Sequence, residues 1–544
     1  MSVDAAEPPD HIEEESLGPT VAKAGGIMMS SQAMSRILGM LRNTVMAAMF
    51  GTALSTEAYN IATTIPDTLF MLVAGGGLSS AFIPVFSELL HQNKKKEAWK
   101  FFSVVVTVCS IAVTALIGIA WALAPWIANR IAGDKVMDGV LVGPEMVPRI
   151  VQMGRILLPA QFAFLIGSIF LGTLYSRKQF LAPAVAPNVY NVGIILGAFI
   201  GGATHFGIAG MAVGGLIGAM IGNIALPILF MSKAKSEYKP SLDLKAEGVK
   251  KFFILLAPVI FGFSLPSMVQ LITTFFAGKY PVGANAVLYL AGTLMQAPSG
   301  IFGQSLALAA FPILAQYYAN GKMDLYRDQM SRSLRTVIFL GLPSAAIMMA
   351  LAPQIVHLLY GYGKAAKDGN LGDIAAATQV YSLSVFAWCV QPVLMRGYFS
   401  VHKTFVPVVI GTAMTALFIG MGYFCLGHGY SYLSLAWATD IAALLMIVIL
   451  YVALEKTVGA LDRPAILSTT AKSLIAATAM GAVAFLGSFA LKAMGLEGRK
   501  LFEALGFLIL CLVAGAVYVF VAHMLKMPET SYFDRVLAKV RRKK

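Results

Sequence analysis

Long apolar segments alternate with short polar joints along almost the whole chain. A helix needs roughly 20 mainly apolar residues to cross about 30 Å of hydrocarbon. Segments of that length recur about fourteen times, so we expect an all-α integral membrane fold. The expected spans are residues 25–50, 58–90, 101–132, 151–174, 183–202, 206–232, 252–278, 284–316, 332–361, 375–400, 406–427, 430–453, 468–492 and 502–525.

Composition supports a membrane environment. The chain has 544 residues, of which 58% are apolar and 12% are charged. Soluble proteins are typically about 45–50% apolar and about 25% charged. Because a soluble surface needs polar cover, the apolar excess is expected to face lipid.

Lysine and arginine are distributed unevenly over the joints. The two tails and the joints after even-numbered spans hold 28 of the 41, the joints after odd-numbered spans hold 10, and three lie within or at the edge of spans. Cytoplasmic loops carry an excess of positive charge. We therefore expect both termini in the cytoplasm of a bacterial inner membrane. The net charge of +14 then reflects orientation and not nucleic-acid binding.

Two halves of the chain resemble each other. The segment ALAPWIANRIAG around Pro125 recurs as ALAPQIVHLLYG around Pro353, 228 positions later. PVFSE at Pro84 recurs as PILAQ at Pro312 with the same separation. This offset covers six spans, an even number, so the two copies share one orientation, as in transporters built from parallel repeats. We expect the prolines of each pair to occupy equivalent places.

The duplication and the charge pattern together predict the domain organisation. Transporters of this kind bind substrate between their repeats and move by alternating access. Acidic residues near the start lack the positive charge of a signal peptide and indicate a disordered tail. The expected units are an acidic cytoplasmic tail at 1–24, a first lobe at 25–232, a cytoplasmic linker at 233–251, a second lobe at 252–453, two further spans within 454–525 and a basic cytoplasmic tail at 526–544.

The first span carries charge at depth. Ser35 and Arg42 lie on one helical stripe, and Arg36 and Asn43 lie on the adjacent stripe. A charge near the bilayer centre costs at least about 2.5–3.5 kcal/mol. Two interpretations are open: the arginines face a watery cavity, or they extend to the headgroups. Arg42 lies about eight residues from the outer end of the span, which favours the cavity.

Acidic residues are sparse at depth. Glu57, Asp67 and Asp440 are candidate proton or cation sites, and each is also open to interpretation as a buried carboxylate paired with a hydroxyl or an arginine. The sequence contains no P-loop, HExxH or nucleophile elbow, so we expect no enzyme activity and no cofactor. The four cysteines have no CxxC spacing, and we expect neither disulfides nor a metal site.

Six motifs are similar to those of one known family. In chain order they are SRILGMLR at 35–42, FG at 50–51, IP at 65–66, SSAFIP at 79–84, APSGIFG at 297–303 and YGYGK at 360–364. They resemble the MurJ (MviN) lipid II flippase family, part of the multidrug/oligosaccharidyl-lipid/polysaccharide flippase superfamily. The first 90 residues carry the most specific part of the resemblance.

The resemblance implies fourteen helices, two lobes and a central cavity of cationic character. It also implies a substrate made of undecaprenyl diphosphate and the peptidoglycan precursor, and arginine suits phosphate oxygens. Positions that are usually charged in the family are neutral here at Asn43, Phe70, Met71, Gly75, Thr293 and Gln296. The residues expected to bind substrate are Arg42, Arg36, Ser35, Asn43, Glu57, Thr293 and Gln296.

The favoured function is translocation of lipid II from the cytoplasmic to the outer leaflet. Three alternatives are open: a flippase for another polyprenyl-diphosphate-linked glycan, a multidrug-type antiporter, and a non-transporting scaffold for cell-wall proteins. An antiporter for cations would need acidic cavity residues, whereas this cavity is expected to be cationic. Membrane lipids, and cell-wall synthesis proteins in the scaffold alternative, are the expected partners.

The topology can be tested with two single cysteines in a variant that lacks the natural ones. Lys94→Cys is expected to resist a membrane-impermeant thiol reagent in intact cells, because its joint is cytoplasmic. Val140→Cys is expected to react, because its joint faces outward. The reverse labelling pattern would exclude this orientation.

Overall fold

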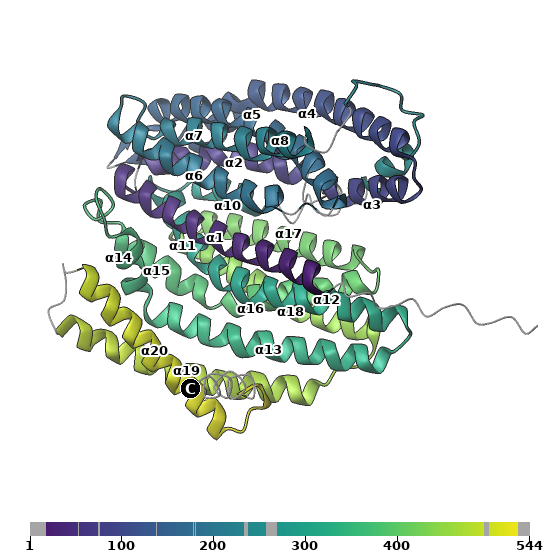
Figure 1. Ribbon diagram of the computed structural model, residues 1–544. Coiled ribbons are helices and arrows are strands. Elements are labelled where there is room, and N and C mark those ends of the chain that lie inside the picture. The colour runs from purple at the N-terminus through teal and green to yellow at the C-terminus, as the bar shows by residue number, and fades with distance from the viewer. Residues whose placement is uncertain are drawn as a thin grey trace, which may run out of the picture.

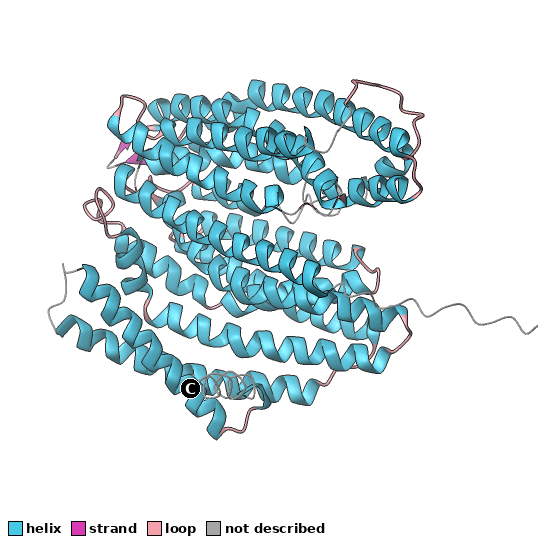
Figure 2. Cartoon of the chain, in the orientation of Figure 1, coloured by secondary structure: helices cyan, strands magenta, loops and turns pink. Residues whose placement is uncertain are grey.

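The computed structural model describes residues 18–52, 54–73, 77–137, 139–177, 179, 181–232, 238–256, 269–493 and 500–530. These residues are almost entirely helical, which confirms the all-α class (Figure 2). The elements are α1 Gly18–Phe50, α2 Leu54–Val73, α3 Gly77–His91, α4 Lys95–Ala132, β1 Val136–Met137, β2 Val140–Leu141, α5 Gly143–Ser176, α6 Leu181–Ala203, α7 Ala209–Met220, η1 Ile221–Ala225, α8 Leu226–Ser232, α10 Val269–Ala277, α11 Ala284–Pro298, η2 Ser299–Gly303, α12 Gln304–Ala319, α13 Met323–Ala350, α14 Ala352–Tyr360, α15 Leu371–Ser382, α16 Val385–Ser400, α17 Phe405–Gly427, α18 Leu433–Val458, α19 Arg463–Ala493, α20 Lys500–Met524 and η3 Pro528–Thr530.

Ten helical segments are long and apolar enough to cross a membrane, and the bent pair α15–α16 makes an eleventh. Three expected spans do not reach this threshold among the described residues. The first is α1, which carries the polar stripe; the second is divided between α2 and α3; the third includes residues 257–268, outside the described part. The chain is therefore a multi-pass membrane protein, and the count of fourteen stays a prediction.

The two expected tails fall largely outside the described residues. Of residues 1–24, only 18–24 are described, and they form the first turns of α1. The helix thus begins seven residues before the predicted span. Of residues 526–544, only 526–530 are described, and η3 ends there.

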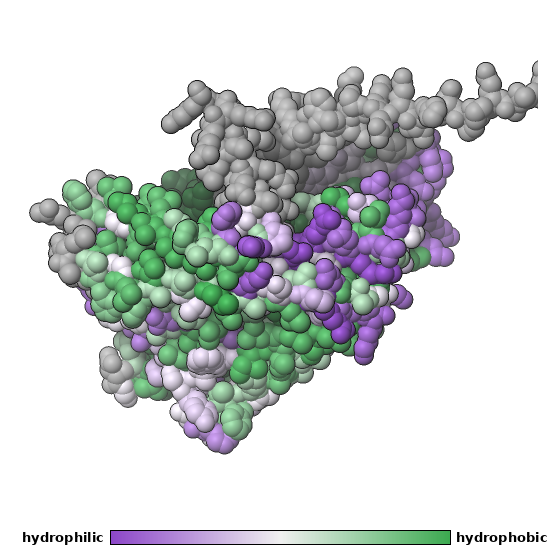
Figure 3. Space-filling view, turned by 90° about the horizontal axis from the view of Figure 1, so that it is seen from below, coloured by the Kyte–Doolittle hydropathy of each residue, from purple (hydrophilic) through white to green (hydrophobic). Residues whose placement is uncertain are grey.

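The joints gather at two opposite ends of the molecule (Figure 1). The β1–β2 hairpin and the loop between α14 and α15 lie at one end, here called the hairpin end. The segment 238–248 and the turn between α12 and α13 lie at the other, here called the linker end. Figure 3 shows hydrophobic side chains over much of one face, with hydrophilic ones gathered toward the linker end.

Helix bounds recur along the chain with the offsets of the sequence repeat. The helix α4 and the pair α13–α14 begin and end 228 residues apart, and so do the starts of α5 and α15. Both ends of α6 and α17, and the starts of α7 and α18, are 224 residues apart. Duplication of a six-span unit would produce this correspondence, which supports equivalent places for the paired prolines.

Segment 238–256 packs on the first half of the chain. Phe252 is buried against Phe101 of α4, with 6.1 Å between ring centroids. Three half-exposed ion pairs, each with an N–O distance of 2.5 Å, join the segment to α3, α4 and the turn between them: Lys94–Glu247, Lys100–Asp243 and Lys251–Glu88. Exposed pairs of this kind contribute roughly 0–1 kcal/mol each, so the aromatic contact is the firmer anchor.

Candidate substrate cavity

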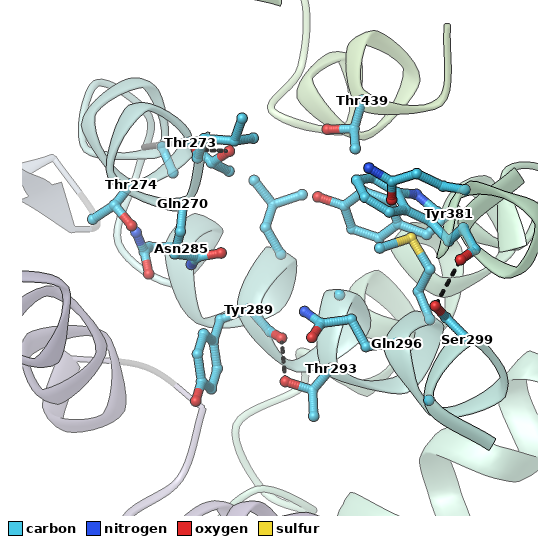
Figure 4. A pocket seen from close by; sticks show the side chains of 18 of the residues that line it. Gln270, Thr273, Thr274, Asn285, Tyr289, Thr293, Gln296, Ser299, Tyr381 and Thr439 are labelled. Carbon is cyan, nitrogen blue, oxygen red and sulfur yellow. Dashed lines mark hydrogen bonds between the residues drawn. The ribbon is translucent and has the colours of Figure 1, made fainter. Parts of the chain in front are cut away.

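A cavity of about 420 Å³ opens between α10, α11, η2, α15, α16 and α18, with one residue from α1 (Figure 4). Its polar lining is mainly neutral amides and hydroxyls. The labelled members in Figure 4 are Gln270, Thr273, Thr274, Asn285, Tyr289, Thr293, Gln296, Ser299, Tyr381 and Thr439. Such a lining gives hydrogen bonds to a polar ligand without imposing a charge.

Arg36 supplies the charge. Among the described residues that line the cavity, it is the one with a formal charge. Its guanidinium packs directly on Gly300 of the π-helical turn η2, where a Cβ atom would displace the end of this flexible side chain. The absent side chain at Gly300 therefore allows α1 to place a cation against the second half of the chain.

The structure brings three of the predicted binding residues together in this cavity. Thr293 and Gln296 lie in the wall formed by α11, and Arg36 faces them from α1. The hydroxyl of Thr293 donates a hydrogen bond to the carbonyl of Tyr289 at 2.9 Å. It therefore still offers its oxygen as an acceptor toward the cavity.

Arg42 lies deeper in α1, beside the cavity and not in its lining. Its Nε donates to Oδ1 of Asn43 at 3.2 Å. Its two terminal nitrogens donate to Oδ1 of Asn191 and to the hydroxyl of Tyr289, each at 3.4 Å. Ser35 accepts a hydrogen bond from Nδ2 of the same Asn191, also at 3.4 Å. Arg42 thus joins α1, α6 and α11, and Tyr289 links it to the cavity.

All of these partners are neutral. Asp67 of α2 is the acid whose charge acts on Arg42, and Tyr59 and Tyr190 complete its surroundings. Hydrogen bonds to neutral groups at 3.2–3.4 Å are long for a guanidinium, because charge-assisted bonds to oxygen are usually about 2.7–2.9 Å. These hydrogen bonds hold the guanidinium of Arg42 in place, and among the described residues no carboxylate lies within ion-pair distance of it.

Glu57 does not join this group. It is fully buried at the start of α2 and forms an ion pair with Lys135, which is also fully buried. The backbone N–H of Gly283 donates to its second carboxylate oxygen. With no exposed side-chain surface, Glu57 is not placed to touch a substrate, and the structure gives no support to its prediction as a binding residue.

Lys135 ties the two halves of the chain together at the hairpin end. Besides the ion pair, its ammonium donates to the carbonyls of Ala277, Tyr280 and Pro281 at 3.0, 2.9 and 3.3 Å. Burial lowers the pKa of Lys135, and the Glu57 carboxylate opposes that shift. Each partner is therefore needed to keep the other one charged in a fully buried site.

The loop between α14 and α15 adds a second tie at the hairpin end. The N–H of Thr52 donates to the carboxylate of Asp368 at 2.6 Å, and the N–H of Lys364 donates to the carbonyl of Ala48 at 2.8 Å. Gly363 has φ +56° and lies directly against the same carbonyl, so this position requires glycine. The YGYGK motif thus fastens the loop to the end of α1.

Sequence reasoning missed Asn191, Tyr289 and Lys135. Asn191 had a readable signal, because an amide inside an apolar span is costly unless it has a partner. Tyr289 is one aromatic residue among many in an apolar segment, so nothing marks it. Lys135 follows Gly133 and Asp134 in a joint whose sequence predicts exposure to solvent. Their roles depend on which helices become neighbours, which the sequence pattern does not specify.

The Lys135–Glu57 pair can be tested against an exposed pair. Glu57→Gln leaves a buried ammonium unpaired and is expected to destabilise the protein by about 3–5 kcal/mol. Lys251→Met breaks the half-exposed pair with Glu88 and is expected to change stability by about 0–1 kcal/mol. Thermal unfolding of the purified protein in detergent measures both.

The double variant Glu57→Gln/Lys135→Met removes both charges and is expected to recover part of the loss. Equal midpoints for the parent and Glu57→Gln would show that the pair does not hold the two halves together.

Comparisons with known proteins identify the family of this chain. The family model described as "Lipid II flippase MurJ" matches residues 46–502. A "Probable lipid II flippase MurJ" from Vibrio cholerae is 27% identical over 458 residues, which cover 80% of this chain and 83% of that protein.

Solved structures show the same fold. One described as "Lipid II flippase MurJ, inward closed conformation" has a TM-score of 0.73 at 22% identity, over 94% of this chain and 99% of the other. An inward-facing multidrug MATE transporter of the MOP superfamily has a TM-score of 0.65 at 13% identity, over 79% and 97%. Because the family model covers most of its length, the chain belongs to the MurJ lipid II flippase family.

Proposed function

We propose that this protein translocates lipid II from the cytoplasmic to the outer leaflet of a bacterial inner membrane, with no chemical step of its own. The observation that carries the proposal is Arg42. It lies within α1 with neutral hydrogen-bond partners, and one of its terminal nitrogens donates to Tyr289, which lines the cavity. A diphosphate is the ligand that such a fork suits, because it can bind two phosphate oxygens at once.

Each part of the substrate has a suitable environment in this proposal. Arg36 and Arg42 hold the diphosphate, and Arg36 reaches it from the cavity lining. The amides and hydroxyls of α10 and α11, with Thr293 and Gln296 among them, bind the sugar and peptide. The neutral residues at the other family positions leave these two arginines as the cationic part of the site.

The proposed cycle is alternating access between two lobes. The first lobe is 25–232 and the second is 252–453, with both termini and the linker 233–251 in the cytoplasm. Lys135 and the YGYGK loop close the hairpin end, which the charge pattern puts outside. The present conformation then holds the cavity shut toward the outer side, and export requires both ties to open.

The role of Arg42 can be tested by complementation of a flippase-depleted strain. Arg42→Ala is expected to abolish growth. Arg42→Lys is expected to lower the transport rate about tenfold or more, because a point charge replaces a two-pronged contact and a charge-assisted hydrogen bond is worth about 1.5–3 kcal/mol. Membrane levels of both variants, measured by blot, are expected to match the parent.

Arg149→Ala is the matched control, since Arg149 is an exposed arginine near the hairpin end of α5. It is expected to grow like the parent. Full growth of Arg42→Ala would mean that the diphosphate is bound elsewhere or that the protein does not carry one.

A further inference from the structure

A carboxylic acid lies behind one wall of the cavity and has no part in the site described above. Asp440 of α18 is 1% exposed. Its neighbour Thr439 and the facing Tyr381 of α15 both line the cavity (Figure 4). Asp440 is therefore separated from the cavity by a single layer of side chains.

Asp440 is bonded to the hinge of a bent helix pair. α15 and α16 are bent by 46° at the two residues between them, Leu383 and Ser384. The hydroxyl of Ser384 forms a hydrogen bond with Oδ1 of Asp440. Tyr381 and Trp388, on either side of this break, both line the cavity. A change at Asp440 can thus reach the cavity wall through the hinge.

The hydrogen bonds around Ser384 accommodate a protonated Asp440. A serine hydroxyl has one hydrogen and two acceptor sites. The hydroxyl of Ser384 has a backbone acceptor, the carbonyl of Tyr381 at 3.2 Å, besides the carboxyl of Asp440. If its hydrogen points to the carbonyl, the close contact with Asp440 needs a hydrogen from the acid. A protonated Asp440 satisfies both contacts at once.

Desolvation points the same way. The second oxygen of Asp440 is buried and has no hydrogen-bond partner among the residues that the structure describes. Tyr381 is the titratable group that faces it from α15, and no charged side chain of the described parts of α10, α16 or α17 interacts with it. An isolated carboxylate in such a place is very costly, whereas a neutral acid is tolerated.

A divalent metal ion such as Ca²⁺ or Mg²⁺ fits this place poorly. Ca²⁺ takes 6–8 oxygen ligands and Mg²⁺ about six. Asp440 and Ser384 offer a carboxyl and a hydroxyl, and the described residues contain no group of three or more His, Cys, Asp or Glu that could hold a metal. A proton needs only one acceptor, and the carboxylate of Asp440 supplies it.

We propose that Asp440 is a proton-binding site of the transport cycle, protonated in this conformation and unloaded when the α15–α16 hinge moves. The step is a simple transfer: the carboxylate takes one proton from water on the outer side and later gives one proton to water on the inner side. One proton enters for each lipid that leaves. This inference rests on the proposed function for its role in transport, but not for the proton itself.

The proton is tested directly by infrared spectroscopy of the purified protein at neutral pH. The parent is expected to show the carbonyl stretch of a protonated carboxylic acid, which shifts in heavy water. Asp440→Asn, nearly the same shape as the neutral acid, is expected to lose that band. Asp373→Asn, at an exposed carboxyl in the first turn of α15, is expected to keep it. An unchanged band in Asp440→Asn would overturn the proposal.

The coupling is tested in vesicles that contain fluorescently labelled lipid II. One pH unit, acid on the hairpin-end side, is expected to shift the leaflet ratio of the parent about tenfold toward that side, the equivalent of one proton per lipid. Asp440→Asn is expected to give the same ratio with and without the gradient. A gradient response that persists in this variant would refute the site.

The two proposals fail in different ways. If the parent does not move lipid II, the proposed function is wrong, and the infrared band still decides whether Asp440 holds a proton. If the parent moves lipid II and responds to the gradient while the band is absent, the proton is carried elsewhere.

Discussion

A charge that leaves water must find a partner, and this constraint decides where the ionised groups of this protein lie. Lysines and arginines collect at the linker end, where water is available. At the hairpin end one lysine is fully buried, with a carboxylate and three carbonyls around it. Arg42, between the helices, has amide and hydroxyl partners in place of a carboxylate, so neutral groups hold it in position.

The helical membrane fold could be predicted from the sequence, because each helix that crosses the bilayer needs an apolar segment long enough to span the hydrocarbon. Helix limits such as those of α6 and α17 follow the predicted spans, and the repeat offset reappears in the helix bounds. The exact number of spans was less accessible. The polar stripe makes α1 less apolar than an ordinary membrane helix. The second expected span is divided between α2 and α3, so it does not form one long apolar helix.

The candidate site was only partly accessible. Arg36, Thr293 and Gln296 meet in the cavity because they lie on helices whose inward faces the polar pattern marks. The ion pair of Glu57 could not be predicted, since an embedded acid looks the same in sequence whether it faces a ligand or a buried lysine. The partner of Glu57, Lys135, lies 78 positions away in a joint whose composition does not distinguish it from the other joints.

The order in which the chain is made gives Lys135 a further consequence. Glu57 and Lys135 leave the ribosome early, but the carbonyls of residues 277, 280 and 281 follow only after the linker has been synthesised. Until then, the ammonium has one of its partners and lacks the others. The hairpin end therefore cannot mature before the second half has been inserted. In a protein truncated after its sixth span, this lysine would keep Glu57 but lack all three carbonyl partners.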